Sequence, residues 1–215
     1  MNTYQSDNST PGYIPPEKFL FLNEQVVNFC DAADGVIDGV IANPRNCRFR
    51  TESLLCKYFP ANNTNCFTPA QVVNLNNIYR DYAETNNSYI FPAFEKGSEG
   101  MWPLTVTGTT WTLQPLYYSL QVLNVSANSY DALGLNFSTI ELAQEINPGQ
   151  VIADDPDLTP YFNKNGKILH YHGWADGLIS SRSSIHYYES VERTLEMDFS
   201  NNYRLFMVPG MVSFY

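Results

Sequence analysis

The sequence predicts an α/β unit after about residue 150 and an irregular region of mixed helix and strand before it. From residue 167 to 208 a strand, a loop carrying an acid, an amphipathic helix and a second strand follow one another, which is the alternation of a parallel α/β sheet. The chain is 44% hydrophobic and 16% charged, as expected of a globular protein. We expect a disordered N-terminal segment at residues 1–13, a cysteine-containing region at 14–150 and the α/β unit at 151–215.

Three helices are predicted in the first region from their starts and their apolar spacing. The first begins near Glu17, after two prolines of the kind favoured in a first helical turn. Capping-box patterns start the second at Thr68 and the third at Ser138, and the third is expected to end at Asn147. The apolar face of the first helix is expected to comprise Phe19, Leu22, Val26, Val27 and Cys30.

The α/β unit is predicted from two strands and the helix between them. The strands are expected at residues 167–173 and 203–208, with the helix from Ser183 to Leu195. Side chains alternate across a strand, so His170 and His172 should point to the same face of the sheet. The inward side of the helix is expected to hold Ile185, Tyr188, Val191 and Leu195.

The four cysteines, Cys30, Cys47, Cys56 and Cys66, lie in an irregular stretch that contains no CxxC pair and no histidine. A structural zinc site is therefore poorly supported, and the even count favours two disulfides with three possible connectivities. Sequential pairing is favoured because each bridge would close a short loop containing turn residues. Four reduced, buried cysteines are the alternative.

Five Asn-x-Ser/Thr triplets also favour an oxidising, extracellular compartment. The N-terminus, however, has neither the basic nor the apolar segment of a signal peptide, and no apolar run of membrane-spanning length occurs. We therefore expect a secreted intact protein, no membrane span, and a leader that precedes this sequence. The candidate glycosylation sites are Asn8, Asn62, Asn86, Asn124 and Asn136.

The net charge of −10 argues against a nucleic-acid partner, because no basic surface is available to neutralise phosphates. An acidic surface suits a neutral or weakly charged substrate.

Residues 30–40 place three carboxylates around two glycines. Calcium prefers such oxygen ligands in a tightly curled loop, and glycine permits the curl. The carboxylates would come from Asp31, Asp34 and Asp38, and the carbonyl groups of Val36 and Val40 could turn inward. The spacing differs from that of an EF-hand, and a solvated acidic turn is an equal alternative on residue types alone.

Asp176 follows the first predicted strand, at the edge where α/β folds assemble their sites. In an α/β-hydrolase the chain order is Ser, then Asp or Glu, then His, and the acid orients the histidine. A residue that caps the following helix is the plainer interpretation.

Several runs, including CDAADGVIDGVIANPRNCRF, CFTPAQV, HGWADGLI and YRLFMVPGM, closely resemble the tannase and feruloyl esterase family from about Ile14 to Met211. The resemblance implies a fragment of an α/β-hydrolase core, its C-terminal strand-helix-strand, at residues 151–215 and an irregular α+β lid domain at 14–150. It implies a structural calcium in the lid, held by the five residues of the acidic loop named above. It also implies the disulfides Cys30–Cys47 and Cys56–Cys66, and Asp176 as the triad acid.

The family's Cys-Ser nucleophile elbow and its His-Cys pair do not occur in this sequence. The resemblance places the serine before residue 1 and the histidine beyond Met211, where the tail departs from the family pattern. Ser98 lacks a preceding strand, and His172, four residues before Asp176, is expected to be structural. We therefore expect this chain alone to be inactive.

The predicted function of the intact protein is hydrolysis of feruloyl, hydroxycinnamoyl or galloyl esters, as small molecules or in plant cell walls. Lid aromatics are candidates to contact a phenolic ring, although core packing is the more common role of any one of them. A non-catalytic, secreted, calcium-dependent binding module and a pseudo-enzyme are the alternatives. The aromatic candidates are Trp102, Trp111, Tyr117 and Tyr118.

Overall fold

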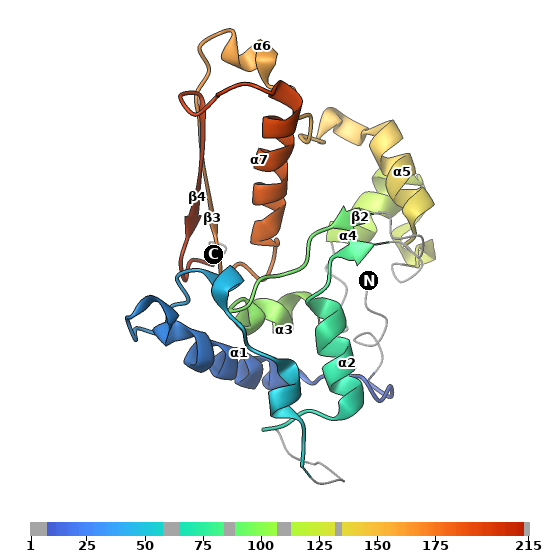
Figure 1. The fold of residues 1–215 in the computed structure, drawn as a ribbon. Coiled ribbons are helices and arrows are strands. Elements are labelled where there is room, and N and C mark those ends of the chain that lie inside the picture. The colour runs from blue at the N-terminus through green and yellow to red at the C-terminus, as the bar shows by residue number, and fades with distance from the viewer. Residues whose placement is uncertain (1–7, 58–64, 84–88, 107–112, 132–134, 213–215) are drawn as a thin grey trace.

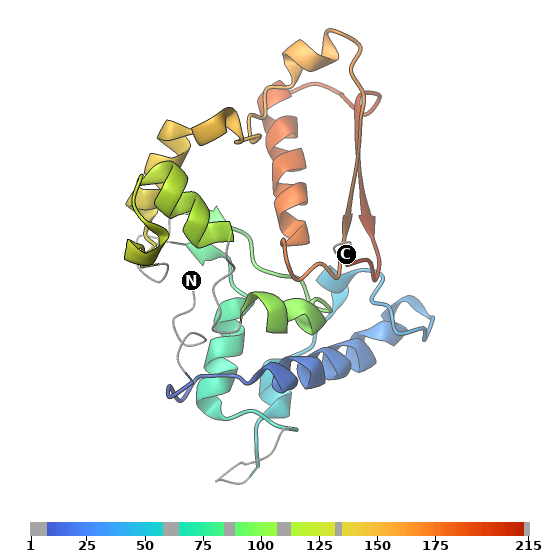
Figure 2. The same cartoon turned by 180° about the vertical axis from the view of Figure 1, so that it is seen from behind.

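A computed structural model describes residues 8–57, 65–83, 89–106, 113–131 and 135–212 of the chain. Figure 1 shows helix α7 (Ser181–Leu195) lying along one face of the paired strands β3 (Ile168–Gly173) and β4 (Tyr203–Val208). Helices α1 (Pro16–Cys30) and α2 (Pro69–Ile78) lie beyond the C-terminal ends of these strands. The view from behind in Figure 2 shows the same two groups of elements.

Helix α1 has prolines at its N-cap and first position, as predicted. It buries Phe19, Leu22, Val26 and Cys30, while Val27 is only partly buried. These side chains pack with Leu75 and other buried residues of α2 and with Trp102 in one hydrophobic cluster. The predicted apolar face therefore forms the main core of the first region.

Helix α2 begins at the predicted capping box. The side chain of Thr68 accepts a hydrogen bond from the Gln71 amide at 3.2 Å, and the Gln71 side chain accepts one from the Thr68 amide at 3.1 Å. Gln71 and Asn74 also donate to the carbonyl groups of Tyr13 and Gly12. Those two residues belong to the segment that was expected to be disordered, so its end is fixed on α2.

The third predicted helix, α5 (Phe137–Ile146), starts earlier than the sequence suggested. Its N-cap is Asn136, whose side-chain oxygen accepts from the Thr139 amide at 3.1 Å, so the cap is two residues before Ser138. An asparagine oxygen reaches the third helical amide as well as a serine hydroxyl does, which explains the difference. The helix ends at Asn147 as predicted, in the left-handed conformation.

The segment before α5 consists of short elements. Strands β1 (Tyr82–Ala83) and β2 (Tyr89–Phe91) form an antiparallel pair. They are followed by α3 (Trp102–Thr105), α4 (Leu113–Leu116) and a π-helical turn at Tyr117–Val122. Helix α6 (Thr159–Phe162) leads into β3.

Strands β3 and β4 are parallel, with Ile168 opposite Tyr203 and Gly173 opposite Val208. The sequence predicted both strands and the helix between them, and the structure confirms the strand-helix-strand order. A second, smaller hydrophobic cluster of Val191, Phe199 and Tyr203 packs between α7 and the strands. The opposite face of the pair exposes Leu169, Tyr171 and Phe206.

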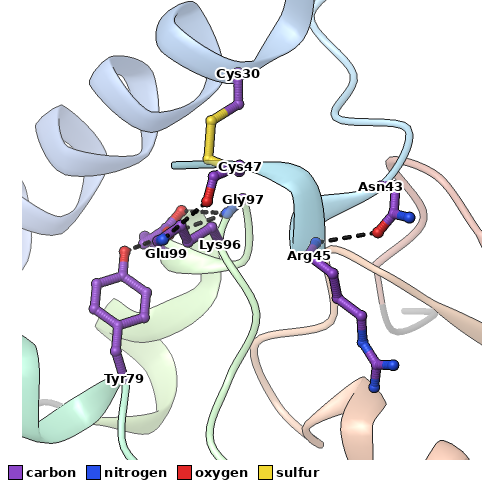
Figure 3. The surroundings of a disulfide bond; sticks show 8 residues. All are labelled: Cys30, Asn43, Arg45, Cys47, Tyr79, Lys96, Gly97 and Glu99. Carbon is purple, nitrogen blue, oxygen red and sulfur yellow. Dashed lines mark hydrogen bonds between the residues drawn. A yellow bond between two sulfur atoms is a disulfide. The ribbon is translucent and has the colours of Figure 1, made fainter. Parts of the chain in front are cut away.

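Both disulfides form with the sequential pairing that the sequence favoured, Cys30–Cys47 and Cys56–Cys66. The first joins the end of α1 to the chain that follows the acidic loop (Figure 3). Across the described ranges, no helix is both long and apolar enough to span a bilayer.

Candidate active site

Asp176 lies in the turn that follows β3, and 6% of its surface is exposed. One carboxylate oxygen, Oδ1, accepts hydrogen bonds from the backbone amides of Leu178 at 2.8 Å and Ile179 at 3.0 Å. The other, Oδ2, lies 3.2 Å from Nε2 of His172. The acid therefore caps the turn before α7, whose own N-cap is Ser180, and also faces a histidine.

A continuous set of hydrogen bonds runs from Asp176 through the space between β3 and α7. Nδ1 of His172 lies 2.6 Å from Oγ of Ser184, which in turn lies 3.0 Å from Nε2 of His170. Nδ1 of His170 lies 2.8 Å from the hydroxyl of Tyr203. His170 and His172 share one face of the sheet, as predicted. We call the set Tyr203, His170, Ser184 and His172 the relay.

Ser184 was not singled out from the sequence. It occupies an inward position of α7, at helical spacing from Tyr188 and Val191, and that pattern marks it as a buried serine among apolar neighbours. A buried hydroxyl requires a partner, and the two histidines of β3 supply it.

Ser184, His172 and Asp176 have the composition of a catalytic triad but not its accessibility. Ser184 is 8% exposed, and its hydroxyl contacts two histidines at once. It does not border the cavity described below. The serine is therefore a structural member of the relay and not a nucleophile.

A cavity of about 280 Å³ lies at the C-terminal ends of β3 and β4. Trp174 and Ala175, which directly precede Asp176, form part of its wall, together with Gly210 after β4. The opposite wall comes from α1, the acidic loop and the loop before α3. Its remaining lining residues include Asn23, Val27, Val40, Ile41, Lys96 and Met101.

Polar contacts hold the turn of Asp176 against the first region. Thr105 Oγ1 donates to the carbonyl oxygen of Gly177 at 2.9 Å, and Ser180 Oγ donates to that of Ala93. Arg182 lies 3.1 Å from Asp81 and 3.5 Å from Glu95. The cavity is thus formed between two regions that are fixed to each other.

The acidic loop is tightly turned, with Gly35 and Gly39 at positive φ. Asp31 is buried, and its carboxylate accepts from the amides of Asp38 at 3.2 Å and Gly39 at 3.0 Å. These hydrogen bonds, the one from Gly39 above all, hold the pKa of Asp31 below its ordinary value.

The oxygen donors of this loop suit calcium, but their side chains are not gathered around one point. Asp34 and Asp38 each accept from an amide two residues further on, at Val36 and Val40. Within the described ranges, no three acidic, histidine or cysteine side chains are arranged as metal ligands. Asp34 and Asp38 would have to turn inward for an ion to be held.

Glu99 is a buried acid that the sequence did not single out, and it lies next to the first disulfide (Figure 3). The Tyr79 hydroxyl donates to it at 2.5 Å, and the Gly97 amide lies 2.9 and 3.0 Å from its two oxygens. Burial raises the pKa of Glu99 to about 7. Lys96 donates to the Cys47 carbonyl oxygen beside it at 3.1 Å.

Ser98 and the aromatic candidates were also singled out from the sequence. Ser98 is buried and structural, because its hydroxyl donates to the Glu95 carbonyl oxygen and accepts from the Trp102 indole. Trp102 is fully buried in the main core, so the core-packing alternative holds for it. Neither Tyr117 nor Tyr118 borders the cavity, and Trp111 lies outside the described residues.

Of the candidate glycosylation sites, Asn8, Asn124 and Asn136 are exposed, whereas Asn62 and Asn86 lie outside the described residues.

Fold and site together define an α/β protein with a buried carboxylate and a cavity at the carboxyl ends of parallel strands. The sequence matches the family described as "Tannase and feruloyl esterase" over residues 1–214, and the chain belongs to this family. It is 29% identical over 214 residues to "Probable feruloyl esterase B-1" of Aspergillus oryzae, covering 97% of this chain and 39% of that protein.

Solved structures give the same relationship. The crystal structure of feruloyl esterase B from Aspergillus oryzae superposes with a TM-score of 0.88 at 30% identity, over 98% of this chain and 43% of that one. Tannin acyl hydrolase from Aspergillus niger superposes with a TM-score of 0.75 at 20% identity, which shows the fold alone, over 98% of this chain and 44% of that one. The chain thus spans about 39% of the length of the curated relative.

Proposed function

We propose that this chain forms part of a serine esterase for phenolic-acid esters, with Asp176 as the acid of a Ser-His-Asp triad. The main support is the position of Asp176, which is buried and fixed at the C-terminal end of a parallel strand beside a cavity. Membership of the tannase and feruloyl esterase family supplies the reaction class. Feruloyl, other hydroxycinnamoyl and galloyl esters are the candidate substrates.

In this mechanism a serine oxygen attacks the ester carbonyl carbon while a histidine takes the serine proton and passes it to the leaving alcohol. Water then hydrolyses the acyl-enzyme by the same route. Asp176 would accept a hydrogen bond from that histidine and stabilise its cationic form. The amides of Leu178 and Ile179 hold the carboxylate in place without adding a charge that would compete with the histidine.

The serine and the general base are proposed to come from outside the described residues. Ser98 and Ser184 are both buried and hydrogen-bonded within the structure, and both ring nitrogens of His170 and of His172 are in use. The 215-residue chain alone is therefore expected to be inactive. Two exposed apolar side chains of β3, Leu169 and Tyr171, support a larger sheet or covering layer in the intact enzyme.

The cavity is the proposed place for the acyl group. Its apolar wall of Val27, Ile41, Met101 and Trp174 suits an aromatic ring, and Asn23 and Lys96 offer hydrogen bonds to phenolic hydroxyls. Of the aromatics first considered, Trp102 is in the core and Tyr117 and Tyr118 do not border this cavity, while Trp111 lies outside the described residues.

Calcium is proposed to bind the acidic loop through the carboxylates of Asp31, Asp34 and Asp38 and the carbonyl groups of Val36 and Val40. Its role would be to order the loop that borders the cavity at Gly39 and Val40, and not to take part in the reaction. Secretion and glycosylation are proposed on the disulfides and the exposed asparagines at positions 8, 124 and 136.

The test compares the full-length product of the encoding gene with its Asp176→Asn variant on methyl ferulate and methyl gallate. Loss of the triad acid is expected to lower kcat by about 10³- to 10⁴-fold. Asp198→Asn is the matched control, since Asp198 is exposed and also accepts from an amide two residues on, at Ser200. Equal activity of the Asp176 and Asp198 variants would refute the assignment.

A further inference from the structure

We infer that every hydrogen bond of the relay is donated toward Asp176, starting from the Tyr203 hydroxyl. We also infer that His172 is a positioning residue for the Asp176 carboxylate. The inference rests on the proposed function, because positioning this carboxylate affects the reaction only if Asp176 is the triad acid. It assigns a task to four side chains that do not border the cavity and would otherwise be ordinary core residues.

The direction of hydrogen-bond donation is determined first at Asp176. An ionised carboxylate only accepts hydrogen bonds, so Nε2 of His172, 3.2 Å away, must carry a proton and donate. In a neutral imidazole the other nitrogen is then an acceptor. Nδ1 of His172 therefore accepts from the hydroxyl of Ser184, at 2.6 Å.

The donors and acceptors of Ser184, His170 and Tyr203 follow from the same rule. Ser184 has one proton, which it gives to His172, so its oxygen accepts from Nε2 of His170 at 3.0 Å. Nδ1 of His170 then accepts from the phenol of Tyr203 at 2.8 Å. Each of the four hydrogen bonds has one donor and one acceptor, with both histidines neutral and protonated on Nε2.

The reverse direction leaves a buried donor without an acceptor. It requires a doubly protonated His172, a Ser184 hydroxyl that donates to His170, and a Tyr203 oxygen that accepts from His170. The phenolic proton of Tyr203 would then need another acceptor, yet Tyr203 is 1% exposed and the described residues give its hydroxyl no hydrogen-bond partner but His170. An unsatisfied buried hydroxyl is costly, so the forward direction is preferred.

The protonation states of Tyr203 and His170 agree with this direction. Burial raises the pKa of Tyr203 to about 12, with smaller contributions from Tyr187 and Tyr188, so the phenol keeps the proton that it donates. Burial also lowers the pKa of His170, so His170 is neutral at pH 7.

The consequence for Asp176 is that its two oxygens are fixed from two different elements. Backbone amides of the turn hold Oδ1, and His172 of β3, braced by Ser184 of α7, holds Oδ2. Removing the His172 donor would remove the hydrogen bond that β3 supplies to Oδ2. The catalytic rate should fall while the binding of substrate is unchanged, because His172 does not border the cavity.

The first test measures the tautomers directly and does not depend on catalysis. In the 215-residue chain labelled with ¹⁵N-histidine, side-chain spectra at pH 7 should show His170 and His172 as neutral Nε2–H forms. The third histidine, His186, is exposed and serves as the internal reference. A His172 that is doubly protonated, or protonated on Nδ1 alone, would overturn the inference.

The second test separates positioning from packing in the full-length gene product. His172→Leu keeps the volume but removes the donor, and should lower kcat for methyl ferulate by about 10- to 100-fold at unchanged KM. His172→Gln keeps an N–H donor and should restore most of that loss. Equal losses in the two variants, or a change confined to KM, would show a merely structural histidine.

Ser184→Ala breaks the relay in its middle, and Ser190→Ala is its control. Ser190 lies on the same helix, where its hydroxyl donates to the His186 carbonyl oxygen outside the relay. The Ser184 variant should lower kcat and shift the His172 ¹⁵N signals, whereas the control should do neither.

If Asp176→Asn leaves hydrolysis unchanged, the proposed function fails while the tautomer result still stands. If Asp176→Asn abolishes hydrolysis and the tautomers differ from those expected, only the relay fails.

Discussion

A Cβ atom added to Gly177 would lie 2.5 Å from the backbone carbonyl oxygen of Ser98. It would also come within 2.7 Å of the Met101 side chain and 3.1 Å of the Trp102 ring. The turn that carries Asp176 therefore packs directly on the loop before α3. Only glycine permits this approach, so the position of the proposed acid depends on the first region as well as on β3.

Gly177→Ala is expected to push the turn of Asp176 away from this loop. The Ser98 carbonyl is backbone and yields little, so the variant should lose about 1–3 kcal/mol of stability in urea unfolding and most of the activity of the full-length product. Gly100→Ala is the control for stability, since the nearest atom to its added Cβ is 3.5 Å away, on the Asn23 side chain. If Gly177→Ala matches this control in urea unfolding and the wild type in activity, the contact does not constrain the acid.

Glu99 should make the fold more stable in acid than in neutral solution. Burial raises its pKa in the folded chain to about 7 from an ordinary value of 4.5. The folded state then binds the proton more tightly than the unfolded chain, so this contribution is complete below about pH 4.5 and is lost as the pH rises through 7. The size of the effect is on the order of 3 kcal/mol.

The measurement is urea unfolding of the wild type and Glu99→Gln at pH 5 and pH 8. The amide keeps an oxygen that can accept from Tyr79 and Gly97 but carries no charge, so the variant should gain stability relative to the wild type on going to pH 8. Glu141→Gln, at an exposed position of α5, controls for the loss of one negative charge. A wild-type-to-variant difference that is the same at both pH values would contradict the assignment.

The elements that the sequence predicted correctly are those set by local rules. The capping box at Thr68, the proline start of α1 and the alternation of β3 each depend on a few neighbouring residues. The start of α5 was misplaced because two capping patterns overlap, and Asn136 precedes Ser138. Propensity alone does not choose between them.

The relay and Glu99 show what local rules leave out. His172 could be related to Asp176 by its spacing, but Ser184 joins the relay only because α7 packs on β3. In the sequence Glu99 resembles a surface acid near two glycines, and its burial depends on Tyr79, the C-cap of α2. The position of Asp176 at a strand end was predictable. Its support by the loop before α3, which contains Ser98, depends on tertiary packing that the sequence does not show.

Loss of the two disulfides should have unequal effects. Each bridge is expected to contribute about 2–4 kcal/mol. Cys30 and Cys47 are 3% and 4% exposed and hold the acidic loop at its base, next to Lys96 of the cavity wall. Cys30→Ala with Cys47→Ala should therefore lower both stability and full-length activity, while Cys56→Ala with Cys66→Ala should lower stability alone. Thermal unfolding and methyl ferulate hydrolysis measure the two effects.

Calcium removal tests the acidic loop. If the loop binds calcium, EDTA should lower the Tm of the 215-residue chain, and added calcium but not magnesium should restore it, because the larger ion tolerates an irregular set of oxygen ligands. Asp34→Asn should weaken calcium binding, measured by calorimetry, with little change in the apo protein, since Asp34 is exposed and accepts its hydrogen bond from Val36 in its own turn.

Asp31→Asn should act differently from Asp34→Asn. The Asp31 carboxylate holds the amides of Asp38 and Gly39, so its replacement should destabilise the apo loop as well as weaken calcium binding. Asp157→Asn is a control at an exposed aspartate that accepts from the Thr159 amide. A Tm that is insensitive to EDTA, together with no heat of calcium binding, would show that the loop is a solvated acidic turn held by its own hydrogen bonds.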